Sequence, residues 1–340
     1  MSILAERLTA QLIAGTPATD PVAVAERLLA IQAQDLRGAR LAIRARSTGL
    51  TALDVDRALT RDRALVVTWL NRGTLHLVRS EDYCWIHALT APRLRMANAR
   101  RLSQEGVPSD AAERGVAVIQ RALAQEGPLD HDRLRDRVAA AGVRTQGQAF
   151  VHLLALASIR GLIVRGPVVQ GKQAFVLVRD WLGEPAPVDR DHALGELARR
   201  YLAGHGPAED RDLACWAGLA LADARAGLRA IASELGERRD GLLALRPHRG
   251  AAPVPEVRLL GPFEPLLLGW HSRRPFLGEA EARVVSGGVF RPFALVRGHA
   301  AATWTLSGGR VRTEPFAPLT NRETIALETE ARDVLRFLAR

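Results

Sequence analysis

The sequence has almost no lysine, very little cysteine and few aromatic residues. Lys172 is the single lysine, Cys84 and Cys215 are the only cysteines, and aromatic residues make up 5% of the chain. Neither cysteine belongs to a CxxC pair or to a Cys/His cluster with zinc spacing, so we expect no structural metal. Both lie in apolar surroundings, which predicts buried thiols in a reducing cytosol.

Long hydrophobic runs are also missing. No stretch is apolar for the roughly 18 to 20 residues that a membrane span needs, and the N-terminus carries no long apolar segment. No coiled-coil pattern or long apolar helix calls for a dimer. We therefore expect a cytoplasmic monomer that does not enter a membrane.

Positive charge predominates in the sequence. The chain has 47 Lys+Arg against 37 Asp+Glu, a formal net charge of +10, and nearly all the cations are arginines. Such an excess favours a polyanionic partner, because each neutralised phosphate releases counterions. A GC-rich genome also replaces lysine by arginine throughout a protein, so composition alone leaves both explanations open.

The 340 residues are 47% hydrophobic and 25% charged, which suits a globular protein of two or three units. Three stretches repeat one pattern, in which two or three short helices are sometimes followed by a pair of strands. We predict an α+β fold of tandem winged-helix (helix-turn-helix) units followed by a C-terminal β-rich module with a terminal helix. The predicted divisions are residues 1–100, 101–185, 186–250 and 251–340.

Hydrophobic periodicity and turn residues predict the individual elements. The helices are expected at 22–31, 38–46, 52–60, 109–125, 130–140, 145–158, 191–203, 208–216, 221–235 and 320–339. The strands are expected at 65–70, 74–78, 162–165, 173–178, 241–245, 257–260, 266–269, 293–296, 301–306 and 311–316. In a winged helix the third helix, here 145–158, is the one that can enter a DNA groove. Three such units with a basic total charge favour DNA as the partner.

A polar cluster, Ile31-Gln32-Ala33-Gln34-Asp35, follows the first apolar helical face. In a helix Gln32 and Gln34 would diverge by about 200°, whereas in an extended or turning segment they can point the same way. From the pattern alone, capping the helix and bonding to backbone is the simpler role for this pair.

Four segments together resemble a known family. They are Ile31–Asp35, Thr68–Leu77 (TWLNRGTLHL), Tyr201–Pro207 (YLAGHGP) and Leu259–Pro265 (LLGPFEP). In this order, over nearly the whole chain, they look like the AlkZ-type (YcaQ-like) bacterial DNA glycosylases, winged-helix proteins of crosslink repair and self-resistance. The resemblance implies that Gln32 and Gln34 are the catalytic Gln-x-Gln pair. It also implies the branch linked to bulky alkylating natural products, because a related branch carries Gln-x-Asp.

The implied chemistry is physically reasonable. Glutamine has no useful pKa and cannot be a general base, but a purine alkylated at N7 is already cationic and leaves without protonation. The protein then has to position a water and to stabilise the positive charge growing on the sugar, which two amide oxygens can do. No cofactor or metal is needed, and the lone Lys172 disfavours a lyase mechanism through a lysine imine.

Other residues are weaker candidates for the site. Asp35 is the nearest carboxylate; it is either a catalytic group or a helix cap and partner of Arg37 or Arg40. Thr74 and His76 are predicted to line the site from the hairpin, with a simple surface or core histidine as the alternative for His76.

Several arginines are candidates for DNA contacts. Arg72 at the hairpin turn suits a phosphate contact or minor-groove insertion, with a solvated loop arginine as the alternative. The basic stretch with Arg93 and Arg95, and the turn with Arg273 and Arg274, are either DNA contacts or solvated surface.

The sequence therefore predicts a monofunctional glycosylase for N7-alkylated purines in double-stranded DNA, including bulky adducts or interstrand crosslinks. The few aromatic residues favour an open cleft over a stacking pocket for an extruded base. The alternative is a non-catalytic winged-helix regulator that reads bases through helix 145–158.

Overall fold

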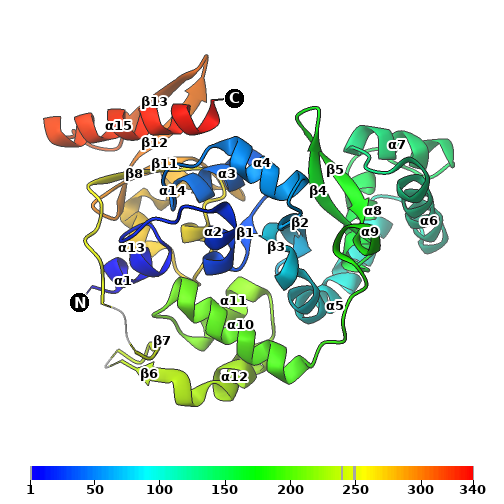
Figure 1. The fold of residues 1–340 in the computed structure, drawn as a ribbon, viewed down its shortest axis with the longest axis horizontal. Coiled ribbons are helices and arrows are strands. Elements are labelled where there is room, and N and C mark those ends of the chain that lie inside the picture. The colour runs from blue at the N-terminus through cyan, green and yellow to red at the C-terminus, as the bar shows by residue number, and fades with distance from the viewer. Residues whose placement is uncertain (1, 239, 248–249, 340) are drawn as a thin grey trace. The chain divides into compact units, whose positions relative to one another are not determined.

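The computed structural model describes residues 2–238, 240–247 and 250–339. The chain forms two compact units, one made of Met1–Val55 with Leu194–Arg340 and the other of Asp56–Ala193 (Figure 1). The fold is mixed, with many helices and small antiparallel sheets. The α+β prediction is confirmed at this level.

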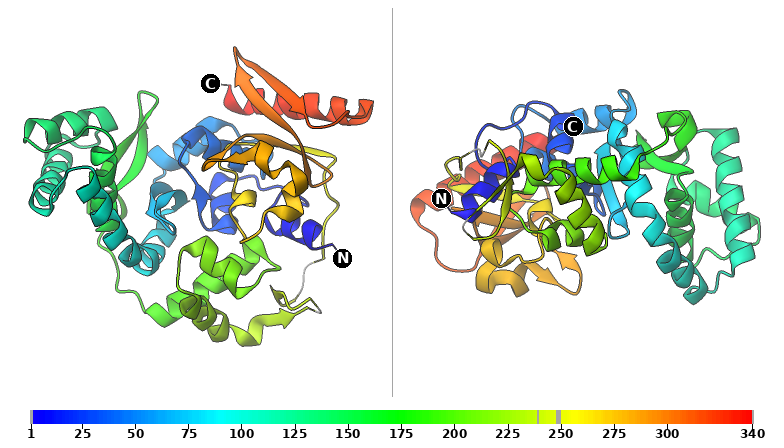
Figure 2. Two further views of the ribbon diagram at one scale, coloured as in Figure 1. Left: turned by 180° about the vertical axis from the view of Figure 1, so that it is seen from behind. Right: turned by 90° about the horizontal axis from the view of Figure 1, so that it is seen from below.

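The Asp56–Ala193 unit is built on an antiparallel sheet. Two hairpins, β2 (Leu65–Leu70) with β3 (Thr74–Arg79) and β4 (Ile163–Val169) with β5 (Lys172–Leu177), join edge to edge through Val67 and Arg165. The helices are α5 (Ser80–Gln104), α6 (Ser109–Glu126), α7 (His131–Ala140), α8 (Ala149–Ile159) and α9 (Val178–Leu182). Figure 2 shows α6, α7 and α8 gathered beside the β4–β5 hairpin.

Helix α8 is the core helix of this unit. Nine of its residues are buried, and only Val151 and His152 are partly exposed. Its sequence, AFVHLLALASI, is apolar on all sides, as expected of a helix that is covered all round. The prediction that the helix at 145–158 enters a DNA groove is therefore wrong, because no polar face is left to enter it.

The other unit begins with α1 (Ile3–Ala10), α2 (Pro21–Leu28), β1 (Ile31–Gln32) and α3 (Leu36–Arg44), and α4 (Ala52–Thr60) runs across the boundary into the Asp56–Ala193 unit. The chain returns with α10 (Arg190–His205), α11 (Asp210–Ala217), α12 (Leu221–Ala230), the 3-10 turn Ala232–Glu234, and the hairpin of β6 (Leu235–Glu237) and β7 (Leu243–Leu245).

A four-stranded antiparallel sheet closes this unit, in the order β13 (Arg310–Pro315), β12 (His299–Ser307), β11 (Phe293–Val296), β8 (Val257–Leu260). Between β8 and β11 lie the short elements Pro265–Leu267, α13 (Arg274–Leu277), Gly278–Ala280, α14 (Glu281–Val284), β9 (Val285–Ser286) and β10 (Val289–Phe290). The last helix, α15 (Asn321–Leu338), packs on β8 and β13 (Figure 1). Leu41 of α3 shares a core with Trp304 and Val334, so the two ends of the chain form one unit.

Most predicted elements are present. Helix α4, β2, β8 and β11 have the predicted bounds, and Asp20, Asp130 and Thr320 accept backbone hydrogen bonds as N-caps. The strand predicted at 266–269 is wrong: Pro265 opens a 3-10 turn capped by the Glu264 side chain. The helix predicted at 22–31 ends at Leu28, because Leu29 turns to φ +62°.

Candidate active site

The Gln-x-Gln segment leaves helix α2 before the first glutamine. Gln32 lies on β1 and is 6% exposed, whereas Gln34 lies at a bend two residues later and is exposed. Neither glutamine is therefore a residue of helix α2, which ends at Leu28. The segment thus holds one buried amide, that of Gln32, and one exposed amide, that of Gln34.

Asp35 fixes the end of this segment. It is the N-cap of α3, and its Oδ1 accepts a hydrogen bond of 2.8 Å from the Arg37 backbone N–H. The cap alternative for Asp35 is thus confirmed, and the short polar segment runs directly into a helix that can hold it in place.

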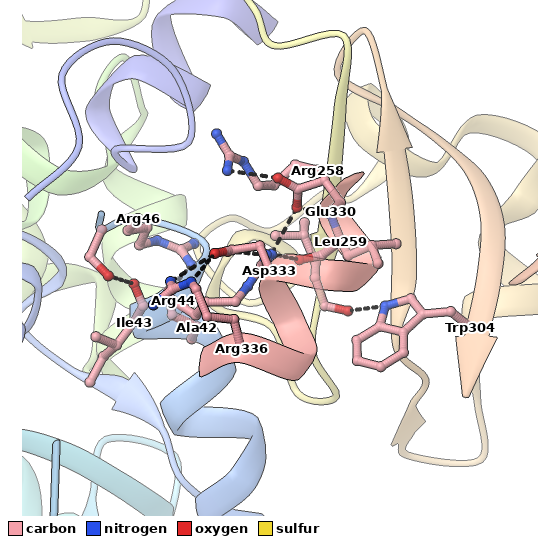
Figure 3. Close-up of polar contacts among 12 residues, drawn as sticks. Ala42, Ile43, Arg44, Arg46, Arg258, Leu259, Trp304, Glu330, Asp333 and Arg336 are labelled. Carbon is pink, nitrogen blue, oxygen red and sulfur yellow. Dashed lines mark hydrogen bonds and ion pairs between the residues drawn. The ribbon is translucent and has the colours of Figure 1, made fainter. Parts of the chain in front are cut away.

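Helix α3 is anchored to the C-terminal half of the same unit by Arg44 (Figure 3). The Arg44 guanidinium is 1% exposed and pairs with Glu330 at 2.9 Å and with Asp333 at 3.0 Å, both on α15. It also donates to the carbonyl oxygen of Leu259. Breaking a buried pair of this kind leaves uncompensated charge, so α3 is tightly tied to α15.

Arg46 makes a second anchor just after α3. Its buried guanidinium pairs with the equally buried Glu264, and it donates to Gln11 and to the carbonyl oxygen of Ala42. Sequence reasoning missed both Arg44 and Arg46. The signal available was two arginines within an otherwise apolar stretch, Leu41-Ala42-Ile43-Arg44-Ala45-Arg46.

The Leu259–Pro265 motif has a structural role beside α3. A Cβ on Gly38 would lie 2.7 Å from the carbonyl oxygen of Pro262, and a Cβ on Gly261 would lie 2.9 Å from Leu41 Cβ. The helix and the motif therefore touch backbone to backbone. Glu264 of the motif holds Arg46, so this motif supports the glutamine segment without supplying its chemistry.

The Tyr201–Pro207 motif supports helix α2 in the same way. A Cβ on Gly204 would lie 2.2 Å from the carbonyl oxygen of Arg27. His205 is 1% exposed, stacks on Tyr201 at 4.7 Å between ring centroids, and is therefore a core residue. The Tyr201 hydroxyl donates to the carbonyl oxygen of Gly269. Helix α2 and helix α3, which flank the two glutamines, are thus each fixed by one of the quoted motifs.

His76 and Thr74 lie on β3 of the Asp56–Ala193 unit. The His76 ring is 2% exposed, and its Nδ1 lies 2.9 Å from the carbonyl oxygen of Thr74. Burial, assisted by the positive charge of Arg72, lowers the pKa of His76 to about 3. The ring is therefore neutral at physiological pH, Nδ1 donates, and the surface-histidine alternative is wrong.

Three of the candidate arginines lie on one region of this unit. Gly73 takes φ +80° at the β2–β3 turn, and a Cβ there would lie 3.4 Å from Leu94 Cδ2, which places Arg72 next to the Arg93–Arg95 turn of α5. Arg93 and Arg95 are exposed, and Arg72 is partly buried. Met96 beside them is 84% exposed. The region is a basic surface with one protruding apolar side chain.

Arg273 and Arg274 differ from each other. Arg273 donates to the carbonyl oxygen of Leu267 at 2.8 Å, lies over the Phe290 ring and pairs with Glu281 at 3.4 Å. Arg274 is exposed at the start of α13. The local contacts of Arg273 leave Arg274 as the more accessible of the two cations.

Other candidate chemistries find little support in the described part of the chain. Residues 2–238, 240–247 and 250–339 hold no group of three or more His, Cys, Asp or Glu side chains arranged for a metal ion. No described helix is long and apolar enough to cross a membrane. Lys172 is exposed and pairs with Asp132 at 3.0 Å. Cys84 is partly buried and Cys215 is exposed, so the expectation of two buried thiols is wrong.

Comparisons with known proteins agree in pointing to one family. A model of the DNA glycosylase AlkZ-like family matches residues 25–337. The interstrand DNA cross-link repair glycosylase of Streptomyces sahachiroi is 26% identical to this chain, over 94% of this chain and 92% of that protein. The solved structure of Streptomyces sahachiroi DNA glycosylase AlkZ has the same fold, with a TM-score of 0.77 and 24% identity over 99% of this chain and 96% of that one.

Proposed function

The chain belongs to the AlkZ-like DNA glycosylase family, and from this we propose that it hydrolyses the N-glycosidic bond of N7-alkylated purines in double-stranded DNA through Gln32 and Gln34. The observation that carries the proposal is the position of this pair. Both amides lie outside a helix, on a segment held between α2 and α3, and one of them reaches the surface.

In the proposed mechanism the two amides act on the sugar. The cationic base departs without an acid, so no protonated group has to face it. The Gln34 side chain is exposed and can hold the attacking water through its amide oxygen, while the buried Gln32 directs its amide dipole at the positive charge of the sugar. Asp35 supports this indirectly, because its carboxylate caps α3.

We propose that the substrates include bulky adducts and interstrand crosslinks. The Streptomyces sahachiroi relative is named as a cross-link repair glycosylase. Only 5% of this chain is aromatic, which suits an open site better than a stacking pocket. Arg72, Arg93, Arg95 and Arg274 are proposed phosphate contacts, and Thr74 and neutral His76 are proposed to line the site.

The winged-helix division at 1–100, 101–185, 186–250 and 251–340 is part of the same proposal. In the second division, three helices precede the β4–β5 hairpin, as in a winged helix. Because α8 is buried, we propose that this division binds DNA through its β4–β5 hairpin, with no base reading by a recognition helix. The regulator alternative depended on that helix, and no other observation favours it.

The test is release of N7-methylguanine from a methylated duplex. Gln32→Ala and Gln34→Ala are each expected to slow single-turnover release by about 100-fold, the usual effect of removing one group that stabilises a transition state. Duplex affinity should stay within about twofold, because neither side chain is charged. Gln125→Ala, at an exposed position on α6, is the matched control and should behave as wild type.

Two results would contradict this function. Folded wild-type protein that releases no base above background would remove the enzymatic proposal. A parallel loss of duplex affinity in the two alanine variants would assign Gln32 and Gln34 a structural role instead.

A further inference from the structure

Arg165 of β4 lies between two aromatic rings without a counter-charge. Its guanidinium carbon is 5.2 Å from the Trp69 ring centroid and 4.8 Å from the Phe175 ring centroid. Among the described residues, no carboxylate comes within ion-pair distance of it, and its buried Nε has no hydrogen-bond partner. The side chain is partly buried, so this unpaired cation is only partly solvated.

Strand register explains why these groups meet on one face of the sheet. Arg165 pairs with Val67 on β2 and with Phe175 on β5. Side chains two residues apart on a strand share a face, so Trp69 lies on the side of Val67, and Gln173 lies on the side of Phe175. Arg165, Trp69, Phe175 and Gln173 therefore form one set, which we call the Arg165 site.

Gln173 adds a second unsatisfied donor to the Arg165 site. Its Nε2 is buried and has no hydrogen-bond partner among the described residues. Arginine has donors only, and the unsatisfied atom of Gln173 is likewise the donor end of its amide. Buried donors left unsatisfied are costly and rare in native structures. Two of them on one face favour an acceptor-rich ligand at this place.

The site is poorly suited to a purely structural role. A partly buried cation without a carboxylate partner stabilises a fold little, and a well-packed apolar residue of similar volume would serve the interior better. The same burial lowers the pKa of Arg165 to about 10, which leaves it charged at physiological pH. The retained charge therefore calls for an anion from outside this unit.

The geometry favours a phosphate group. The guanidinium carbon lies close to both rings, and the N–H donors of a guanidinium match the geometry of phosphate oxygens. A second cation is close by: Arg63 is exposed and lies 4.2 Å over the ring of Trp181, whose indole nitrogen would be 2.7 Å from a Cβ on Gly166, the neighbour of Arg165. Two cations on one sheet-bearing unit suit a chain of phosphates.

We propose that the Arg165 site binds a backbone phosphate of the DNA substrate, with Arg165 as the cation and Gln173 as a second donor. This inference rests on the proposed function only in taking DNA as the polyanion. Arg165 is a positioning residue in this scheme, because it holds the duplex and does not touch the sugar that reacts.

The first experiment compares Arg165→Met with Arg114→Met in the full-length protein. Arg114 lies exposed on α6 and pairs with Asp110, so its replacement removes the same charge from the same unit. Arg165→Met should weaken binding of undamaged duplex by about tenfold and lower the slope of log Kd against log salt by about 0.9. Arg114→Met should leave both near the wild-type values.

Thermal stability separates binding from folding. The Tm of Arg165→Met should equal or exceed that of wild type without DNA, because an uncompensated cation has been removed from the interior. A lower Tm with unchanged duplex affinity would overturn the proposal and make Arg165 a structural residue. Arg165→Lys, which keeps the charge but loses the stacked plane, should bind with intermediate affinity; affinity equal to wild type would contradict the role given to the N–H donors.

A duplex panel identifies the ligand atom. Each duplex carries one neutral methylphosphonate in place of a phosphate, and at one position wild type should lose about tenfold in affinity while Arg165→Met loses nothing further. If no position behaves in this way, DNA is not the ligand. A rise in wild-type Tm with inorganic phosphate at constant ionic strength, without any effect of Arg165→Met on duplex binding, would assign the site to a free anion and overturn the proposal.

These outcomes are independent of the glycosylase chemistry. Duplex affinity is measured on undamaged DNA with Gln32 and Gln34 intact, and base release is measured separately. A protein that binds DNA through Arg165 but releases no base would retain this inference and lose the catalytic one.

Discussion

Burial controls the chemistry of individual residues, and His76 is the clearest case. With a folded pKa near 3, below the ordinary value of 6.5, His76 takes up a proton on unfolding at any pH between these two values. The unfolded state therefore binds more protons there, and the free energy of unfolding falls as the pH is lowered below 6.5. Above pH 6.5 the residue has no such effect.

We expect His76→Gln to flatten the acid side of the stability curve. The contribution is about 1.4 kcal/mol for each pH unit, so between pH 6.5 and 5.0 wild type should lose about 2 kcal/mol more than the variant. Urea unfolding at pH 7.5 and 5.0 measures the difference. Identical losses in the two proteins would mean that His76 is solvated in the folded state.

The contacts of individual buried residues were the part of the structure that the sequence predicted least. The resemblance predicted Gln32 and Gln34 as the catalytic pair, and the hairpin turn and a basic stretch predicted Arg72, Arg93 and Arg95 as DNA contacts. The anchors could not be predicted, because Arg44 meets Asp333 across 289 positions of sequence and only the folded chain brings them together. Arg165 was missed for the same reason, since Trp69 and Phe175 come from two other strands.

At the scale of elements, local sequence patterns predicted where many helices and strands lie. They did not predict how those elements pack against distant parts of the chain. The β2–β3 hairpin and helix α4 were predicted because turn residues and caps act within a few positions. The role of α8 was predicted wrongly, because the helix is covered by α5, α6 and β2, and this cannot be read from its own sequence. The strand predicted at 266–269 is absent, because Pro265 opens a 3-10 turn there that the Glu264 side chain caps.

We expect the link between α3 and α15 to be essential to folding. Arg44→Met should lower the free energy of unfolding by about 3 kcal/mol, because Glu330 and Asp333 lose a buried partner. Arg336→Met is the control: Arg336 also pairs with Asp333, but at the surface, and should cost under about 1 kcal/mol. Equal effects of the two variants in chemical denaturation would contradict the anchor.

The contact between α10 and α2 allows a second test with glycines. Gly204→Ala should cost at least about 2 kcal/mol, because the new methyl group would overlap the carbonyl oxygen of Arg27. Gly195→Ala, on the same helix, meets side-chain atoms alone, Ala230 Cβ at 3.3 Å and Ile231 Cγ2 at 3.7 Å, and should be tolerated far better. Thermal unfolding of the two variants gives the comparison, and similar Tm values would show that the helices can separate freely.

At the scale of the whole molecule, the net charge of +10 governs association with DNA. With about six phosphate contacts, affinity for undamaged duplex should fall about 1000-fold between 50 and 200 mM salt. The single-turnover rate of the bound complex should hardly change, because the reacting amides are neutral. A weak salt dependence of binding would indicate that few of the exposed arginines touch the backbone.

The position of the single lysine allows selective labelling of this enzyme. Lys172 projects from the start of β5, 61% exposed at the tip of the hairpin that carries Arg165 and Gln173. Amine-reactive dyes would find a single side-chain target there, far along the chain from the glutamine segment. A fluorophore attached at that tip would report docking of the hairpin on a duplex in real time, without mutation of any residue.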